Sequence, residues 1–288
     1  MSTPSVWEDS IALNLHDELK FDVLEAPAAY QETDTLRASW DSENLPIAEA
    51  LERDTFPLPN TKDREGYYGA NHFSYWASGL RDMRNLLDCA ATHGVDVKSY
   101  FDFGCASGRT IRHFAANRPD IEVLGADINR RHIEFVNRYL PNSITAFQSH
   151  SIPTLPLPDN SIDLVSAFSV FTHIEAFETT WLMELRRIMK PGGLAWVTIH
   201  SDKTWEEVGE GWPLYTGLRN HPKYKEIGAL RPMPEERLVF RWRSDRSYSS
   251  NVFYSFSYIH RVWGKYFDVA AIHRRLPVFQ DVVILRKR

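Results

Sequence analysis

The sequence predicts an α/β protein with a seven-stranded, mostly parallel sheet that ends in an antiparallel strand pair, with helices on both faces. Between residues 98 and 200, short apolar runs alternate with stretches of helical periodicity, which is typical of β/α units and a parallel sheet. Near the C-terminus, two apolar runs are separated by only a few residues, including Pro277, and so short a connection can join only antiparallel neighbours. These two observations together predict the fold class.

The individual elements follow from the same patterns. Strands are expected at residues 99–103, 122–127, 144–148, 163–169, 194–200, 267–274 and 279–285. Helical spacing of apolar residues predicts crossover helices around 111–115 and 130–140, a third helix over 181–189 that stops at Pro191-Gly-Gly193, and a long amphipathic helix over 73–90 before the first strand.

Two regions do not follow the β/α pattern. Residues 1–65 are polar and punctuated by proline, and they are expected to form an N-terminal extension with short helices. Residues 66–288 are expected to form the main domain. Within it, residues 201–248 hold many Pro, Gly, Trp and Arg residues without clear periodicity, which predicts a lid-like insertion over the sheet after the fifth strand.

Charge and cysteine content narrow the class of protein. The 33 basic and 38 acidic residues leave a formal charge of −5, which gives no general attraction for nucleic acid or anionic membranes. Cys89 and Cys105 are too few for a disulfide framework and are not spaced as a metal site, so no metal is expected. The sequence shows no signal-peptide pattern and no apolar run of ~20 residues. A cytoplasmic protein is therefore predicted.

A glycine-rich stretch, FDFGCASGR at Phe101–Arg109, follows the first strand and precedes a helix. Such a turn lets a ligand approach the backbone amides at the carboxyl edge of a parallel sheet, although a tight turn without a ligand is the alternative. Asp127 ends the second strand about twenty residues later, where a carboxylate can accept hydrogen bonds from ribose hydroxyls. The dinucleotide fingerprint itself fails, because Ala106 and Arg109 replace two of its three glycines.

Four ordered motifs, FDFGCASGR, LGADIN, LPLPDNSIDLVSAFSVFTHIE and LRRIMKPGGLAWVTIH, make the chain similar to class I S-adenosylmethionine-dependent methyltransferases. The resemblance covers roughly residues 67–200 and 250–287 and implies a Rossmann-like sheet and S-adenosyl-L-methionine as cofactor. For the methionine part of the cofactor, the resemblance implies contacts at Asp102, Gly104, Ala106 and Gly108, and it places Ser169 and Val170 beside the sulfonium. For the ribose it implies Asp127, and for the adenine it implies Ile128, Ser149 and His150. Ser149-His150-Ser151 stands where the family often has an aspartate, so a hydroxyl or backbone atom is expected to replace that contact.

The residues that act on the acceptor are expected at the same sheet edge. A hydroxyl acceptor must lose its proton, and histidine is the usual agent. His173 and His200 follow the fourth and fifth strands, and each is a candidate base or a structural histidine. The predicted acceptor or cofactor cover consists of Tyr67, Tyr68 and His72, which do not fit the apolar stripe of the long helix, and of Phe171 beside the sulfonium.

The sequence thus predicts a methyltransferase for a small-molecule or sugar acceptor, with a hydroxyl as the expected accepting group. A protein or nucleic-acid methyltransferase is one alternative, although SVFTH stands where an Asn/Asp-Pro-Pro-aromatic motif would follow the fourth strand. A non-catalytic cofactor-binding partner protein is the other, although the glycine loop and Asp127 are intact. The sequence indicates neither the identity of the acceptor nor the oligomeric state.

Overall fold

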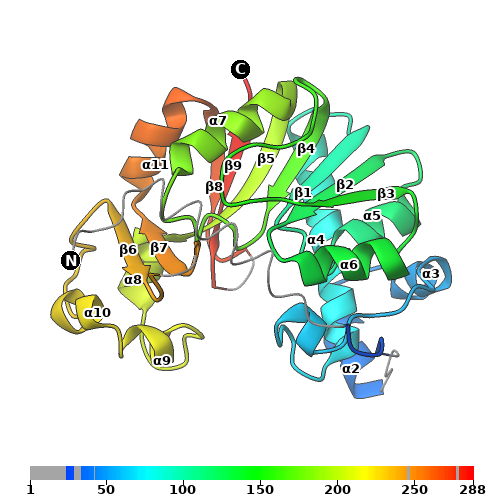
Figure 1. The fold of residues 1–288 in the computed structure, drawn as a ribbon, viewed down its shortest axis with the longest axis horizontal. Coiled ribbons are helices and arrows are strands. Elements are labelled where there is room, and N and C mark those ends of the chain that lie inside the picture. Colours follow the sequence, from blue (N-terminus) through cyan, green and yellow to red (C-terminus); the bar gives the residue numbers. More distant parts are fainter. Residues whose placement is uncertain (1–23, 29–33, 42, 245–246, 277–278) are drawn as a thin grey trace. The chain divides into compact units, whose positions relative to one another are not determined.

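The computed structural model describes residues 24–28, 34–41, 43–244, 247–276 and 279–288 (Figure 1). The chain forms two compact units. The N-terminal unit lies within residues 17–150 and 162–166, and the C-terminal unit contains residues 151–161 and 167–288. Residues 1–23 of the predicted extension, residues 245–246 of the predicted insertion and Pro277 of the predicted final turn lie outside the described residues.

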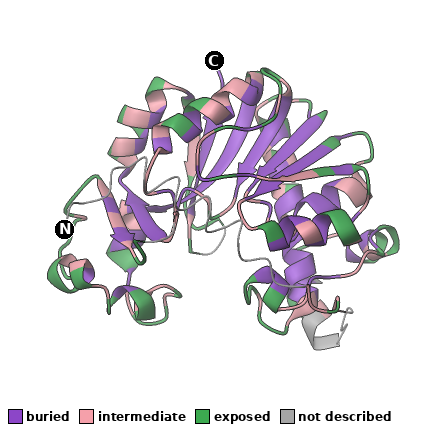
Figure 2. Ribbon diagram, in the orientation of Figure 1, coloured by how far each residue is buried: buried purple, intermediate pink, exposed green. Residues whose placement is uncertain are grey.

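Four parallel strands form the centre of the N-terminal unit. They are β1 (Ser99–Phe103), β2 (Glu122–Asp127), β3 (Ile144–Gln148) and β4 (Ile162–Ala167), in the order β3-β2-β1-β4. Strands β1 and β4 are buried along their whole length (Figure 2). A strand covered on both faces favours apolar residues at successive positions, which explains the mainly apolar runs of the sequence. The parallel pairing brings all four carboxyl ends to one edge.

Helices pack beside these strands. They are α4 (His72–Thr92), α5 (Ile111–Asn117) and α6 (Arg130–Tyr139), while α2 (Asp34–Asp41), α3 (Ile47–Arg53) and the short 3-10 helix η1 (Lys62–Arg64) belong to the extension (Figure 1). Helix α4 begins after Asn71, whose side chain accepts a hydrogen bond from the Ser74 amide at 2.9 Å. Within the described ranges, no helix has the length and apolar character needed to cross a membrane.

A buried ion pair fastens the extension to α5. The guanidinium of Arg112 is fully buried and donates from Nε and Nη2 to the carboxylate of Asp54 at 2.7 and 2.8 Å. It also donates to the carbonyls of Phe56 at 2.6 Å and Pro57 at 3.1 Å. The indole of Trp76 donates to the same carboxylate at 2.8 Å. Residues 54–57 are therefore held against the helices of this unit by charge-assisted hydrogen bonds in a dry environment.

The C-terminal unit contains a second group of strands. They are β5 (Met189–Ser201), β6 (Arg237–Arg241), β7 (Ser250–Tyr254), β8 (Asp268–His273) and β9 (Asp281–Arg286). Strand β5 has two partners here, an antiparallel one in β9 and a parallel one in β7. Strand β8 pairs antiparallel with β9, and β6 pairs antiparallel with β7. The helical elements α7 (Glu178–Ile188), α11 (Phe256–Val262) and η2 (Trp263–Lys265) complete the unit apart from the insertion.

The predicted fold class is confirmed. All seven predicted strands form, the first three with the predicted bounds, and the last two are the expected antiparallel pair. Strand β5 starts at Met189, so Pro191-Gly-Gly193 lies in a strand and the helix before it ends at Ile188. The sheet is larger than predicted because β6 and β7 were missed. In β6, three residues alternate with the buried Leu238 and Phe240, so the apolar signal is only two residues long.

The predicted insertion is a folded structure with its own core. It contains α8 (Asp202–Glu207), α9 (Tyr215–Leu218), α10 (Pro222–Ile227) and strand β6. Their buried side chains, together with one from β7, form an apolar cluster of Trp205, Val208, Leu218, Tyr224, Leu238, Phe240 and Phe253. Sequence periodicity missed this organisation because these elements are short and the cluster joins residues that are distant in the sequence.

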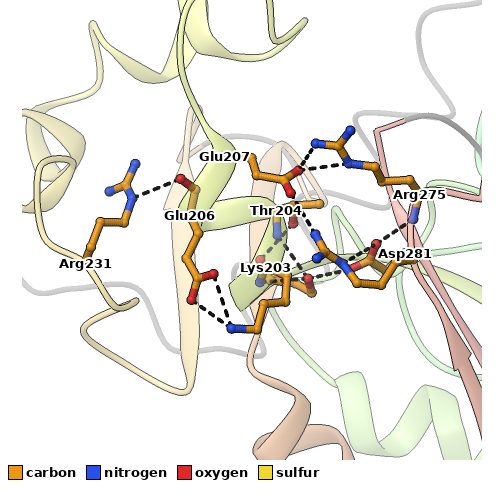
Figure 3. A network of polar contacts seen from close by, with 9 residues as sticks. Lys203, Thr204, Glu206, Glu207, Arg231, Arg275 and Asp281 are labelled. Atoms are coloured by element: carbon orange, nitrogen blue, oxygen red, sulfur yellow. Dashed lines mark hydrogen bonds and ion pairs between the residues drawn. The ribbon is translucent and has the colours of Figure 1, made fainter.

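Polar contacts brace the first helix of the insertion against the β8–β9 hairpin (Figure 3). The Glu207 carboxylate accepts from Arg274 Nη2 at 2.9 Å and from Arg275 Nε at 3.0 Å. Buried Asp281 accepts from the Ser201 hydroxyl at 2.5 Å and from the Arg275 amide at 2.8 Å. The end of β5, helix α8 and the hairpin are thereby fixed to one another.

Candidate functional site

The glycine loop after β1 has an unusual backbone. Gly104, Ala106 and Gly108 all have positive φ angles, of 82°, 46° and 83°. The amides of Gly104 and Cys105 donate to the carbonyl of Ala126 at 2.8 and 3.0 Å, so the loop folds back over the end of β2. A left-handed alanine costs about 1–2 kcal/mol relative to the right-handed form. Strain of this kind is concentrated at ligand-binding sites.

Gly108 has a packing role that the sequence did not predict. A Cβ atom at this position would lie 2.4 Å from Leu140 Cδ1 and 3.3 Å from Val136 Cγ2. Helix α6 and the residue after it therefore occupy the space beside this glycine. Packing against this helix is therefore one reason for a glycine here, and the cofactor contact of Gly108 stays a prediction.

Gly79 brings α4 against the same loop. A Cβ atom at Gly79 would lie 2.0 Å from the Arg109 carbonyl oxygen, so only glycine permits this approach. The Arg109 side chain then pairs with Asp82 of α4 at 2.6 Å and contacts Ser78 Oγ at 3.2 Å. A lone glycine inside an otherwise helical pattern was the available signal for this contact.

Asp127 joins the glycine loop to the start of α6. Its Oδ2 accepts from the Ala106 amide at 2.9 Å, its Oδ1 accepts from the Asn129 amide at 2.8 Å, and His132 Nδ1 lies 3.3 Å from Oδ1. Burial alone raises the pKa of Asp127, but the charge of His132 and the hydrogen bonds outweigh burial and hold this pKa below its ordinary value. A carboxylate offers about four lone-pair positions, and the two amides use two of them. The group is thus charged and retains capacity for two hydroxyl donors.

Asp102 lies deeper than the other predicted cofactor contacts. Its Oδ1 accepts from Ser166 Oγ at 2.5 Å, and the Tyr100 hydroxyl lies 2.7 Å from the same Ser166 oxygen. Burial raises the pKa of Asp102 to about 7, although the hydrogen bond from Ser166 opposes this. The structure therefore gives Asp102 one definite role, which is to connect β1 with β4.

The predicted adenine contacts lie at the ends of β2 and β3. Ile128 is half-buried, and its carbonyl accepts from Gln148 Nε2 at 3.2 Å. Ser149 is buried, and its amide donates to the Asp127 carbonyl at 2.9 Å. His150 is exposed. Gln148 was missed by the sequence reasoning and is an additional polar side chain at this end of the site.

The N-terminal extension contacts the glycine loop directly. The Ser107 hydroxyl donates to the Asp63 carbonyl, and Arg131 Nε pairs with the Asp63 carboxylate. Asn129 Nδ2 donates to Glu65 Oε1 at 2.9 Å. The segment after η1 is therefore attached both to the glycine loop and to the first turn of α6. Sequence patterns gave no signal for these pairs, because about forty or more residues separate the partners.

Tyr67, Tyr68 and His72 lie in or just after this segment. Tyr68 has a φ of 62°, and the Tyr67 and Tyr68 rings meet edge to face at 4.8 Å. Tyr67 is 54% exposed, and the Arg109 guanidinium of the glycine loop lies 5.8 Å from its ring centre. His72 Nδ1 lies 2.9 Å from Arg64 Nη2, and burial together with the charge of Arg64 lowers the pKa of His72. An exposed aromatic beside the loop fits a covering role for Tyr67.

In the C-terminal unit, β7 holds the turn that carries His173. The Val252 amide donates to the Thr172 carbonyl at 2.8 Å, and His173 Nδ1 lies 2.7 Å from the Ser250 carbonyl oxygen. Because a carbonyl can only accept, Nδ1 carries a proton, and the lone pair of the neutral ring is on Nε2.

His200 is placed differently. It is 3% exposed and packs against the rings of Trp212 and Phe253, with centroids 5.4 and 5.2 Å away. Burial lowers its pKa to about 3. A group with so low a pKa is a weak proton acceptor at neutral pH. The structure thus disfavours His200 as the base.

Phe171 is a core residue rather than an acceptor contact. Its side chain is fully buried, lies 5.2 Å from the Trp263 ring, and its carbonyl accepts from the Tyr254 hydroxyl at 3.0 Å. Ser169, by contrast, is exposed with a φ of 56°, and its amide donates to Thr198 Oγ1 at 2.7 Å. Val170 is half-buried.

The sheet of the N-terminal unit is a parallel β/α sheet with a glycine loop after its first strand and a charged carboxylate at the end of its second. This combination is typical of proteins that bind a nucleoside-containing ligand. Residues 101–197 match the family model described as a methyltransferase domain. Residues 101–197 therefore form a methyltransferase domain of the class I S-adenosylmethionine-dependent type, and S-adenosylmethionine is the cofactor of that type.

Curated relatives match about half of the chain. An uncharacterized methyltransferase of Schizosaccharomyces pombe is 31% identical over 145 residues, which are 46% of this chain and 52% of that protein. A sterol 24-C-methyltransferase of Gibberella zeae is 25% identical over 154 residues, or 50% of this chain and 40% of that protein. The chain thus spans about half or less of the length of these relatives.

Solved structures resemble the chain more distantly. A 1,6-didemethyltoxoflavin-N1-methyltransferase of Burkholderia thailandensis, solved with 1,6-didemethyltoxoflavin and S-adenosylhomocysteine, has 11% identity and a TM-score of 0.49 over 91% of this chain and 94% of that one. An S-adenosylmethionine-dependent methyltransferase of Aquifex aeolicus has 15% identity and a TM-score of 0.47 over 72% and 90%. Likeness at this level carries no argument about the site.

Proposed function

We propose that this protein is an S-adenosylmethionine-dependent methyltransferase that methylates a small-molecule or sugar acceptor, with a hydroxyl as the accepting group. The observation that carries the proposal is the charged Asp127 carboxylate, which is bound to the glycine loop and still has capacity for two hydroxyl donors. When bound, the cofactor supplies a methyl group on a sulfonium, which is already an activated leaving group.

The residues of the N-terminal unit fit that cofactor. The backbone of the loop at Gly104–Ala106 is proposed to hold the methionine part, and Asp127 the two ribose hydroxyls. Ile128 offers a half-buried apolar surface for the adenine, and Gln148 and Ser149 lie at the end of the next strand. The main contribution of such a site to the rate is orientation, which can supply about 7–11 kcal/mol in well-aligned systems.

The proposal of a small acceptor and a cytoplasmic location rests on the sequence. A net charge of −5 gives no attraction for nucleic acid. The folded insertion, with its own apolar core, is the part of the chain that we propose to shape the acceptor site.

We assign the role of general base to His173. Its Nδ1 is engaged by the Ser250 carbonyl, which fixes the ring and directs the basic lone pair to Nε2. In the reaction, Nε2 would accept the proton of the acceptor hydroxyl.

Nitrogen chemical shifts in an NMR spectrum of the labelled protein test the state of His173. At neutral pH, His173 should show a protonated Nδ1 and an unprotonated Nε2, whereas exposed His260 serves as a reference for a histidine in water. An Nε2-protonated neutral ring at His173 would contradict the assignment.

Isothermal calorimetry tests the cofactor. The protein should bind S-adenosylhomocysteine with a stoichiometry of one and should not respond to NADH, because the dinucleotide fingerprint is broken at Ala106 and Arg109. Tight NADH binding without a response to S-adenosylhomocysteine would reject the proposed function.

A further inference from the structure

Arg64 is a buried arginine whose charge is not balanced by any acidic side chain among the described residues. The residue is 3% exposed at the end of η1. Its Nη2 donates to the Gly69 carbonyl at 2.6 Å and to His72 Nδ1 at 2.9 Å, and both partners are neutral acceptors in this arrangement. Its Nε and Nη1 are buried and have no hydrogen-bond partner among the described residues. No acidic side chain in the described part of the chain forms an ion pair with it.

Other arginines of the same unit show what is missing. Arg109, Arg112 and Arg131 each pair with an aspartate, at 2.6 Å for Arg109 and 2.7 Å for Arg112. Burying an ionised group without a counter-charge is costly, so such groups are normally paired. Burial accordingly lowers the pKa of Arg64. An anion supplied from outside the chain would remove this cost.

The surroundings of Arg64 place it beside the glycine loop. The preceding residue, Asp63, accepts a hydrogen bond from Ser107 of that loop. The Arg64 guanidinium lies 4.7 Å from the ring centre of Tyr75, whose hydroxyl is also buried without a partner among the described residues. Both Arg64 and Cys105 of the loop influence the pKa of Tyr75, which burial raises to about 12. The Arg64 guanidinium, with Nε and Nη1 unused, and the Tyr75 phenol, with its hydroxyl unused, thus lie close together near the loop.

We propose that Arg64 binds the carboxylate of the cofactor's methionine part, with the Tyr75 hydroxyl as a second donor. This inference rests on the proposed function, which places the methionine part at the glycine loop. A carboxylate is the anionic group of that part, and it pairs well with a guanidinium because both are planar and the bonds are charge-assisted. Binding would then also fix η1 and the residues after it over the loop.

The test compares two ligands that differ only in the carboxylate. S-adenosylhomocysteine carries it, and S-adenosyl-3-thiopropylamine has a hydrogen in its place. In calorimetry, the wild-type protein should prefer S-adenosylhomocysteine by ~10- to 100-fold, the range for a hydrogen bond to a charged group. Arg64→Gln should remove this preference and leave the affinity for S-adenosyl-3-thiopropylamine unchanged. Tyr75→Phe should reduce the preference less.

Two features keep the experiment decisive. Unchanged binding of S-adenosyl-3-thiopropylamine shows that the Arg64→Gln protein is folded, and Arg53→Gln, at an exposed arginine of the same unit, should change neither affinity. An equal loss for both ligands, or no loss for either, in Arg64→Gln would overturn the inference. If the wild-type protein binds neither ligand, the proposed function fails and this inference fails with it.

Discussion

Replacing Asp54 with Asn should lower the free energy of unfolding by about 3–5 kcal/mol, as measured by urea denaturation. The reason is that Arg112 is fully buried and would keep its charge without a counter-ion, while the bonds that hold residues 54–57 would weaken. Few single substitutions lower stability by this much, and leaving a buried charge without its partner is one of the known causes.

Two controls separate this effect from a general loss of surface charge. Glu49→Gln removes the partner of Arg53 in an exposed pair at 3.7 Å and should have almost no effect. The double variant Asp54→Leu with Arg112→Met removes both charges and should recover much of the stability, because a well-packed apolar pair avoids the unpaired ion. Equal losses in Asp54→Asn and Glu49→Gln would show that the buried pair contributes nothing special.

The same pair predicts an acid-dependent loss of stability. Burial alone raises the pKa of Asp54, but hydrogen bonds from Arg112 and its charge outweigh burial, so the folded-state pKa lies below the ordinary value of an aspartate. A depressed carboxyl pKa contributes stability that is present above the unfolded pKa and is lost as the pH falls through the folded pKa. The difference in stability between wild type and Asp54→Asn should therefore be constant near neutral pH and shrink below about pH 4.

Asp127→Ala should weaken the binding of S-adenosylhomocysteine by about 3–6 kcal/mol, because two hydrogen bonds from hydroxyls to a charged group are lost at about 1.5–3 kcal/mol each. The loop also loses the bond between the Ala106 amide and the carboxylate. Calorimetry at neutral pH measures the change directly.

Asp127→Asn is the informative intermediate. It keeps one acceptor oxygen but loses the charge, so its affinity should lie between those of the wild type and the alanine variant. Asp120→Asn, which changes an exposed acid just before β2, should leave the affinity unchanged. Wild-type affinity in a folded Asp127→Ala protein would mean that this carboxylate serves only the loop.

Much of the fold was predictable because its determinants are local. Short apolar runs mark the strands of a parallel sheet in the sequence, and β1, β2 and β3 were placed to the residue. The position of Asp127 at the end of β2 was predictable for the same reason. The contacts of Asp63 were not, because its partners Ser107 and Arg131 lie on elements that the sequence does not mark as neighbours.

Burial argues against two of the predicted site residues. His200 and Phe171 stand at strand ends, where sequence reasoning expects exposed functional groups, but the unpredicted strand β7 and the residues around Trp263 enclose them.

The ion pair between Asp54 and Arg112 has an evolutionary consequence. The family model begins at residue 101, so Arg112 lies inside the region that matches the family and Asp54 lies upstream of it. A homologue with a different N-terminal segment cannot keep the arginine alone, because the unpaired ion would destabilise its core. Positions 54 and 112 should therefore covary, and an arginine at position 112 should mark the relatives that retain this type of N-terminal segment.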